Sequence, residues 1–349
     1  MSKKRESNIE LLRIFSMLGV IVLHYNNNGG GLQYVTKYSA NYFVLIIMES
    51  LTICAVDLFM LISGYFSCKN KKTLIEKPIK LLTQVIIFSF GHYLIASFIN
   101  GTLSIKGTIA SIVPANYFVI LYIVVYLLSP YLNLIYDTVS DNFIILIVSV
   151  FSVYPTLVDW FSKFTGKNWF GLSSIGLNGS QEGYQIVNFI MMYYVGMYIN
   201  KNIDKLKNIS IVKLIMLVIA TTLIISLMAN GFEILGIGMN TAWSYCNPFI
   251  VVEAVLIFLI FNKINIGSKR YINKISAASF TVYLTHCYLI QYIGVEWAIQ
   301  QNTIIMLLHL YISVIAIYLV CFIVYLIYSY LAKFVTDRLK HKETVITKL

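Results

Sequence analysis

The chain carries little charge for its length. Only 12% of its 349 residues are Asp, Glu, Lys or Arg, whereas 58% are hydrophobic. Soluble proteins carry roughly 25% charged residues. So small a share of charge indicates that most of the surface faces something other than water, and it argues against an ordinary soluble enzyme.

Other features are also missing. The five cysteines are scattered and form no C-x-x-C pair, and the sequence contains no glycine-rich phosphate loop, H-E-x-x-H or G-x-S-x-G motif. We therefore expect no disulfide framework, no metal site and no bound cofactor, and we interpret the cysteines as small apolar core residues. The apolar runs show no internal repeat, which weakens the case for an inverted-repeat transporter.

Long apolar runs dominate the sequence. Since a helix needs about 20 apolar residues to cross a bilayer, they predict an all-α, polytopic integral membrane bundle of about ten transmembrane helices. We expect a single domain over residues 1–349, with a retained first span rather than a cleaved signal peptide. The predicted spans are 8–25, 41–66, 79–99, 116–136, 142–158, 184–200, 210–229, 245–262, 275–299 and 304–333, followed by a basic cytoplasmic tail at 334–349.

The distribution of basic residues predicts the orientation. Of the 26 Lys and Arg residues, 21 lie in the two tails and in the connections 67–80, 200–213 and 262–274. By the positive-inside rule these segments face the cytoplasm, and so do the N- and C-termini. The formal net charge of +11 then matches the lipid bilayer rather than nucleic acid, which we exclude as a partner.

Six ionisable side chains within the predicted spans are candidates for function, because a charge inside a bilayer costs several kcal/mol. They are Glu10, Arg13, His24, Asp57, Glu253 and His286. Arg13 and His24 are eleven residues apart, which places them within about 20° of one helix face and about 16 Å apart along the axis. A snorkelling arginine beside a structural histidine would account for the same spacing.

The other four candidates can be placed relative to this pair. Glu10 lies one turn before Arg13 and can neutralise it. Asp57 lies at a depth from which it could pair with Arg13. Glu253 and His286 lie near the middle of their spans, where either could face a polar cavity between Arg13 and His24.

Four motifs follow one another along the chain. The first motif, E-x-x-R-x10-H, consists of Glu10, Arg13 and His24, and the second is VDLFMLISGY at 56–65. The third begins with NYF and ends with LSP over 116–130, and the fourth is SFTVYLTH at 279–286. Together they resemble the membrane acyltransferase 3 family of bacterial O-acyltransferases, over about residues 8 to 335. The chain departs from the family at NYF, where Trp is common. We also expect no appended extracytoplasmic hydrolase-like domain, so that the final transfer would fall to the membrane domain alone or to a separate partner.

The resemblance implies an O-acetyltransferase of the bacterial plasma membrane. Its co-substrate would be cytoplasmic acyl-CoA, most simply acetyl-CoA, and its acceptor a hydroxyl of a cell-envelope glycan or a lipid-linked oligosaccharide precursor. His24 would be the catalytic general base. Arg13 would bind acyl-CoA with support from Glu10 and Asp57, while His286 would orient a reactant or stabilise the oxyanion.

Two other functions account for the spans and the buried charges. One is a transporter or flippase of a lipid-linked glycan or a small anion, and the other is a membrane glycan polymerase. A transporter would move its substrate without consuming acyl-CoA, whereas a polymerase would lengthen glycan chains. Neither predicts the order of the four motifs.

Overall fold

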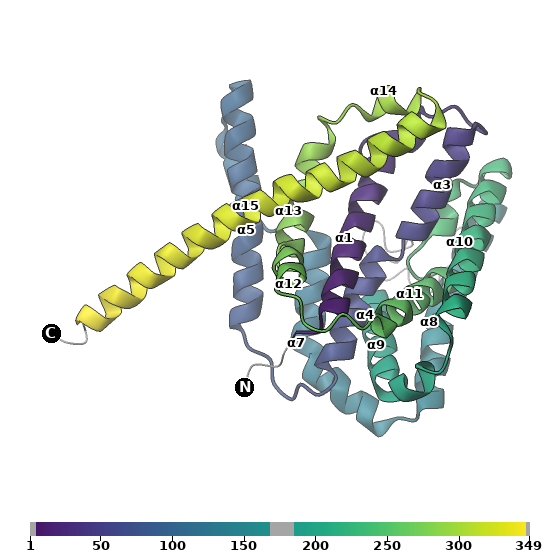
Figure 1. Cartoon of the computed structure of the whole chain (residues 1–349), viewed down its shortest axis with the longest axis horizontal. Coiled ribbons are helices and arrows are strands. Elements are labelled where there is room, and N and C mark those ends of the chain that lie inside the picture. Colours follow the sequence, from purple (N-terminus) through teal and green to yellow (C-terminus); the bar gives the residue numbers. More distant parts are fainter. Residues whose placement is uncertain (1–4, 168–184, 347–349) are drawn as a thin grey trace.

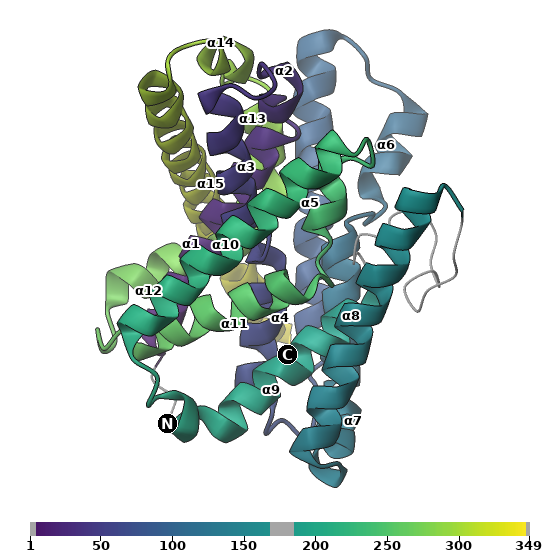
Figure 2. The same cartoon turned by 90° about the vertical axis from the view of Figure 1, so that its right-hand side faces the viewer.

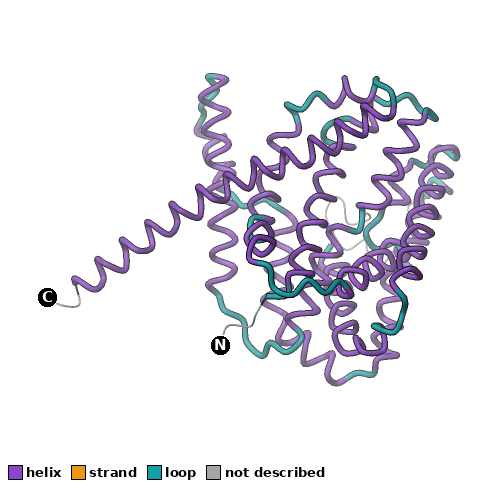
Figure 3. The backbone as a smooth tube through the Cα atoms, viewed as in Figure 1, coloured by secondary structure: helices purple, strands orange, loops and turns teal. Residues whose placement is uncertain are grey.

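The computed structural model describes residues 5–167 and 185–346, and every element in these ranges is helical (Figures 1 and 3). The first half contains α1 (Ser7–Asn26), α2 (Gly31–Tyr34), α3 (Ala40–Thr52), α4 (Ala55–Ser67), α5 (Glu76–Asn100), α6 (Ile105–Ile112), α7 (Tyr117–Thr138) and α8 (Asp141–Thr165). The second contains α9 (Ile186–Leu206), α10 (Ile211–Ile234), the 3-10 helix η2 (Met239–Trp243), α11 (Pro248–Lys263), α12 (Arg270–Ser276), α13 (Ser279–Ile290), α14 (Val295–Ile299) and α15 (Thr303–Ile346). The all-α fold predicted from the sequence is confirmed for this part of the chain.

Seven helical segments of the described chain are long and apolar enough to cross a membrane. The predicted spans 184–200, 245–262 and 275–299 fall on other helices, and residue 184 itself lies outside the described ranges. Of these helices, α11 and α13 have only 16 and 12 residues, and the 21 residues of α9 include several amides and charges. The structure therefore supports a multi-pass membrane protein, and the count of ten stays a prediction.

The outer surface of the bundle suits lipid. Large apolar side chains are exposed along α5, α10 and α15, including Phe98 (92% exposed), Leu227 (71%) and Ile304 (72%). A soluble protein rarely exposes contiguous apolar surface on this scale, because burial of apolar area in water is strongly favourable. In a bilayer the same side chains contact acyl chains.

Two predicted spans are not continuous helices. Span 41–66 is broken between Thr52, where α3 ends, and Ala55, where α4 begins. Span 275–299 is broken after Ile290, and the chain passes through Gly294 with φ of +65° before α14. Hydropathy follows side chains and not backbone, so an apolar run does not reveal such a break. Helix α15 extends beyond the predicted tenth span into the predicted basic tail and ends at Ile346.

A glycine pair fixes the position of α4. A Cβ on Gly64 would lie 1.9 Å from the carbonyl oxygen of Tyr193, and one on Gly196 would lie 2.1 Å from that of Leu61. Any larger residue at either position would push α4 and α9 apart, as small residues do at other close helix crossings in membranes. The crossing holds in place the helix that carries Asp57 and one wall of the site.

Helix α1 runs through the bundle and contacts α3, α4, α11, α12, α13 and α15 (Figures 1 and 2). Basic connections lie beside its N-terminal end. The backbone N–H of Lys269 donates to Ser7 Oγ at 2.6 Å, and Lys263 Nζ donates to the carbonyl oxygen of Lys207 at 2.5 Å. Their common location is the one expected if the N-terminus and these connections face the same side of the membrane.

Candidate active site

Two cavities lie one after the other along α1. Arg13 lines the first, which has a volume of about 240 Å³, and His24 lines the second, which has a volume of about 590 Å³. Tyr283 of α13 lines both. The two residues of α1 that the sequence placed on one helix face therefore belong to two neighbouring chambers. We call these the arginine cavity and the histidine cavity.

The arginine cavity is organised by one carboxylate, that of Glu10. Arg13 Nη1 donates to Glu10 Oε1 at 2.6 Å, while Ser276 Oγ donates to Glu10 Oε2 at 2.5 Å. Glu10 thus joins α1 to α12 and holds the guanidinium, which is one-third exposed and faces the cavity. The ion pair lowers the cost of placing Arg13 in the membrane and leaves its remaining N–H groups for a ligand.

A second cation, Lys77 of α5, lines the same cavity. Its Nζ donates to the hydroxyl of Tyr122 at 2.7 Å and lies 4.3 Å from the ring centroid of Tyr126. Within the described residues Lys77 forms no ion pair. In the sequence, Lys77 is only one of several lysines that predict the orientation in the membrane, because nothing in 67–80 distinguishes it from the others.

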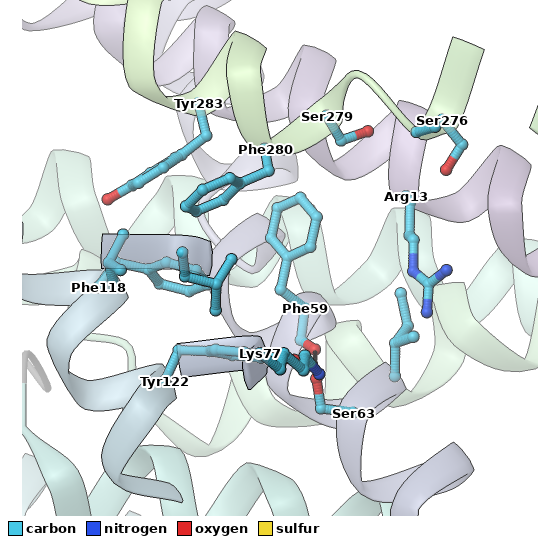
Figure 4. Close-up of a pocket in the computed structure, with 14 residues that line it drawn as sticks. Arg13, Phe59, Ser63, Lys77, Phe118, Tyr122, Ser276, Ser279, Phe280 and Tyr283 are labelled. Carbon is cyan, nitrogen blue, oxygen red and sulfur yellow. Dashed lines mark hydrogen bonds between the residues drawn. The ribbon is translucent and has the colours of Figure 1, made fainter. Parts of the chain in front are cut away.

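Aromatic side chains form the rest of the arginine cavity. Phe59, Phe118 and Phe280 line it between the two cations and Tyr283 (Figure 4). Two cations and an apolar wall in one cavity suit a ligand with an anionic head and a slender uncharged chain.

The histidine cavity contains a facing pair of imidazoles. The rings of His24 and His286 are 4.8 Å apart between centroids. His24 Nδ1 lies 2.6 Å from Asn28 Oδ1, and His286 Nδ1 lies 2.9 Å from the carbonyl oxygen of Val282. Because both oxygens accept, each Nδ1 carries a proton, and Nε2 is the ring nitrogen that can act as a base when the imidazole is neutral. The site therefore brings together two imidazoles whose Nε2 atoms are candidate bases.

Amide and carboxylate groups surround these histidines. Asn27, Asn28, Glu49 and Asn116 line the histidine cavity, together with the aromatic residues Tyr117 and Tyr245. Glu49 is buried and accepts from the amides of Asn26 at 2.8 Å and Asn27 at 2.9 Å. Glu49 was not among the residues predicted from the sequence, because it stands near the outer end of its predicted span. Asn28 was not predicted either, although it follows His24 by one helical turn and could have been found from that spacing.

A family model matches residues 6–326, a range that includes both cavities: it is that of the acyltransferase 3 family and describes an acyltransferase domain. The chain belongs to this family. It is a membrane acyltransferase, as the four motifs predicted. Neither the comparison with curated proteins nor the comparison with solved structures finds a match.

The acyltransferase also places a thiol beside its two histidines. Cys287 Sγ lies 3.4 Å from His286 Nε2, and one ligand atom each of His24, His286 and Cys287 falls within 4.8 Å of the others. Imidazole nitrogen and cysteine sulfur are the ligands that Zn²⁺ prefers, so this group has the composition of a metal site. The sequence predicted no metal site, because the two helices concerned lie far apart along the chain and show no ligand spacing.

Two predicted residues of the acyltransferase line neither cavity and, unlike Glu10, hydrogen-bond to side chains outside both. Asp57 does not pair with Arg13 as expected: it is 1% exposed, and its Oδ1 accepts from Asn188 of α9 at 3.0 Å. The break before α4 and the close crossing with α9 direct it there. Glu253, expected to face the cavity, instead lies between α10 and α11 and accepts from Thr222 at 2.5 Å.

Proposed function

We propose that this acyltransferase transfers an acetyl group from cytoplasmic acetyl-CoA to a hydroxyl of a cell-envelope polysaccharide or its lipid-linked precursor, at the bacterial plasma membrane. One observation carries the proposal. The His24 imidazole, with its Nδ1 hydrogen-bonded to Asn28, stands in a cavity lined by amides and a carboxylate, and this cavity shares the lining residue Tyr283 with a second cavity lined by two cations.

The arginine cavity suits the donor. Arg13 and Lys77 bind phosphate oxygens through charge-assisted hydrogen bonds. The phosphates stay at this end, because moving them against Phe59, Phe118 and Phe280 would strip their water without replacing it. The uncharged arm of the donor then extends along α1 for about 16 Å toward His24.

The histidine cavity suits a sugar as acceptor. Its amide groups and the Glu49 carboxylate pair with hydroxyls, and Tyr117 and Tyr245 offer aromatic faces to the C–H faces of a pyranose ring. A cavity lined by positively charged groups would favour an anionic acceptor instead, but Lys and Arg are absent among its described lining residues.

The chemistry follows from the tautomer of His24. Nε2 accepts the proton of the acceptor hydroxyl while its oxygen attacks the thioester carbonyl carbon. When the tetrahedral intermediate collapses, the C–S bond breaks and the proton passes from Nε2 to the thiolate, so that the products are an ester and free CoA. His286 Nε2 accepts a hydrogen bond from a neighbouring hydroxyl and thereby orients the acceptor.

The test is thiol release from acetyl-CoA by purified protein in nanodiscs, with and without envelope glycan. His24→Ala should lower the rate by about 10²- to 10⁴-fold, the range supplied by a general base. His92→Phe is the matched control, because His92 stacks on Tyr288 of α13 outside both cavities. Unchanged release in folded His24→Ala would refute the role of this residue. Glycan movement without CoA release would indicate a transporter.

A further inference from the structure

Three side chains of the histidine cavity bring metal-ligating atoms together: His24, His286 and Cys287. One ligand atom of each lies at most 4.8 Å from the other two, and Cys287 Sγ lies 3.4 Å from His286 Nε2. A tetrahedral Zn²⁺ ion, with bonds of about 2.0 to 2.1 Å to nitrogen and about 2.3 Å to sulfur, holds its ligand atoms about 3.3 to 3.6 Å apart. The contact between Cys287 and His286 already has this spacing, and side-chain rotations that move atoms by about 1 Å bring the third ligand to it.

The hydrogen bonds of the two imidazoles match those of metal-bound histidines. A histidine that binds a metal through one ring nitrogen almost always donates the N–H of the other to an oxygen or a water, which fixes the ring. His24 Nδ1 has Asn28 Oδ1 as its partner, and His286 Nδ1 has the carbonyl oxygen of Val282. Nε2 of each ring is therefore the nitrogen left to bind a metal, and both rings are oriented before one arrives.

The surroundings of the three ligands admit a cation. Asn27 and Asn28 line the same cavity and are exposed at the end of α1, so the cavity can be reached from water. The carboxyl group of Glu49 also lines it, and its described lining residues include no Lys or Arg whose charge would repel a metal. Two nitrogens and a sulfur suit Zn²⁺, whereas Mg²⁺ and Ca²⁺ prefer oxygen. The site therefore favours Zn²⁺ over these ions.

We propose that Zn²⁺ binds His24, His286 and Cys287 and inhibits acyl transfer by occupying the catalytic base. The inhibition rests on the proposed function, in which His24 Nε2 accepts the proton of the acceptor hydroxyl, whereas the binding does not. Zn²⁺ forms bonds to both Nε2 atoms and to Sγ, and the thiol of Cys287 loses its proton to water. The lone pair of His24 Nε2 is then held in a bond to the metal and cannot accept a proton.

The first experiment measures metal binding without catalysis. Purified protein in nanodiscs, free of any polyhistidine tag, is titrated with Co²⁺, which takes the same ligands as Zn²⁺ and gives a thiolate-to-metal charge-transfer absorption when cysteine is bound. Wild type should develop this absorption up to one Co²⁺ per chain. Added Zn²⁺ should remove it, because nitrogen and sulfur sites bind Zn²⁺ more tightly than Co²⁺.

Variants of the ligands sharpen this measurement. Cys287→Ser should abolish the absorption and lower the affinity for Zn²⁺, measured by competition with a chelating dye, at least about tenfold. Asn28→Ala should lower the affinity by about 10- to 100-fold, the effect of losing the partner that orients a histidine ligand. Cys68→Ser is the matched control, because this partly buried cysteine lines neither cavity. Cys287→Ala replaces Cys287→Ser if the latter fails to fold.

The second experiment measures CoA release at free Zn²⁺ concentrations set by a metal buffer, since the phosphates of acetyl-CoA also bind the ion. Wild type should be inhibited by Zn²⁺, recover when a chelator is added, and be unaffected by Mg²⁺. Raising the acceptor glycan should relieve the inhibition, because both require His24. The half-inhibiting concentration should rise at least about tenfold in Cys287→Ser and stay at the wild-type value in Cys68→Ser.

The two experiments separate the two claims. If wild type releases no CoA, the proposed function fails, and the Co²⁺ titration still decides whether the metal site exists. If wild type binds Co²⁺ without the charge-transfer absorption, or if folded Cys287→Ser binds Zn²⁺ as tightly as wild type, the inference is overturned. CoA release that stops on chelation and returns with Zn²⁺ would also overturn the inhibition, because the metal would then be required.

Discussion

The arginine cavity and the histidine cavity share one helix and the lining residue Tyr283, yet their polar side chains differ in kind. The first combines Arg13 and Lys77 with phenylalanine walls, and the second combines His24 with amides and a carboxylate. Cations bind an anionic group, and the apolar walls beside them keep that group from moving further into the protein. Amides instead pair with neutral hydroxyls. The difference supports the proposal that each cavity receives one of the two substrates and that the reaction occurs where they meet.

Among the substitutions that distinguish the roles of the two cavities, Arg13→Ala is expected to have the largest kinetic effect. Removing one partner of a charged pair costs about 2 kcal/mol or more, so the KM for acetyl-CoA should rise about 30-fold while kcat at saturation changes little. Lys201→Ala is the control, because it removes a cation that pairs with Asp141 outside the arginine cavity. A rise in the acceptor KM instead would show that the donor does not bind at Arg13.

A smaller effect is expected in the histidine cavity from Asn28→Ala. Its Oδ1 fixes the proton of His24 on Nδ1, and loss of one such hydrogen bond costs about 1 to 1.5 kcal/mol. We expect kcat to fall about tenfold with the KM for acetyl-CoA unchanged, measured as initial rates of CoA release. Equal loss of affinity for acetyl-CoA would contradict the division between the two cavities.

The smallest effect is predicted for Glu49→Gln. Glutamine keeps one oxygen to accept from the amide of Asn26 or Asn27 and loses the other, a change of about 0.7 kcal/mol. The KM for the glycan acceptor should rise about threefold with the KM for acetyl-CoA unaltered. If Glu49→Gln leaves the acceptor KM at its wild-type value, Glu49 only holds α3 against α1.

The part of the site that lies on α1 could be predicted from the sequence. The eleven-residue spacing of Arg13 and His24 fixes their common face, and the three-residue spacing of Glu10 and Arg13 allows the ion pair that the structure contains. Both relations are local to one helix. Helical periodicity is therefore enough to derive them.

The rest of the site depends on contacts between distant segments. Lys77 and Tyr283 join the arginine cavity because α13 packs against both α1 and α5, and no spacing along the chain encodes this. Asp57 was paired with the wrong partner for the same reason. Depth in the membrane suggested Arg13, but the break before α4 and the close approach at Gly64 turn the carboxylate toward α9.

The most direct test of the two-cavity account uses sealed proteoliposomes with the acceptor glycan trapped inside. Acetyl-CoA, which does not cross the bilayer, is added outside to protein sorted by orientation. Vesicles that present Arg13 outward should acetylate the trapped glycan and release free CoA outside, and His24→Ala should abolish both products. Acetylation that requires donor and acceptor on the same side of the membrane would contradict the account.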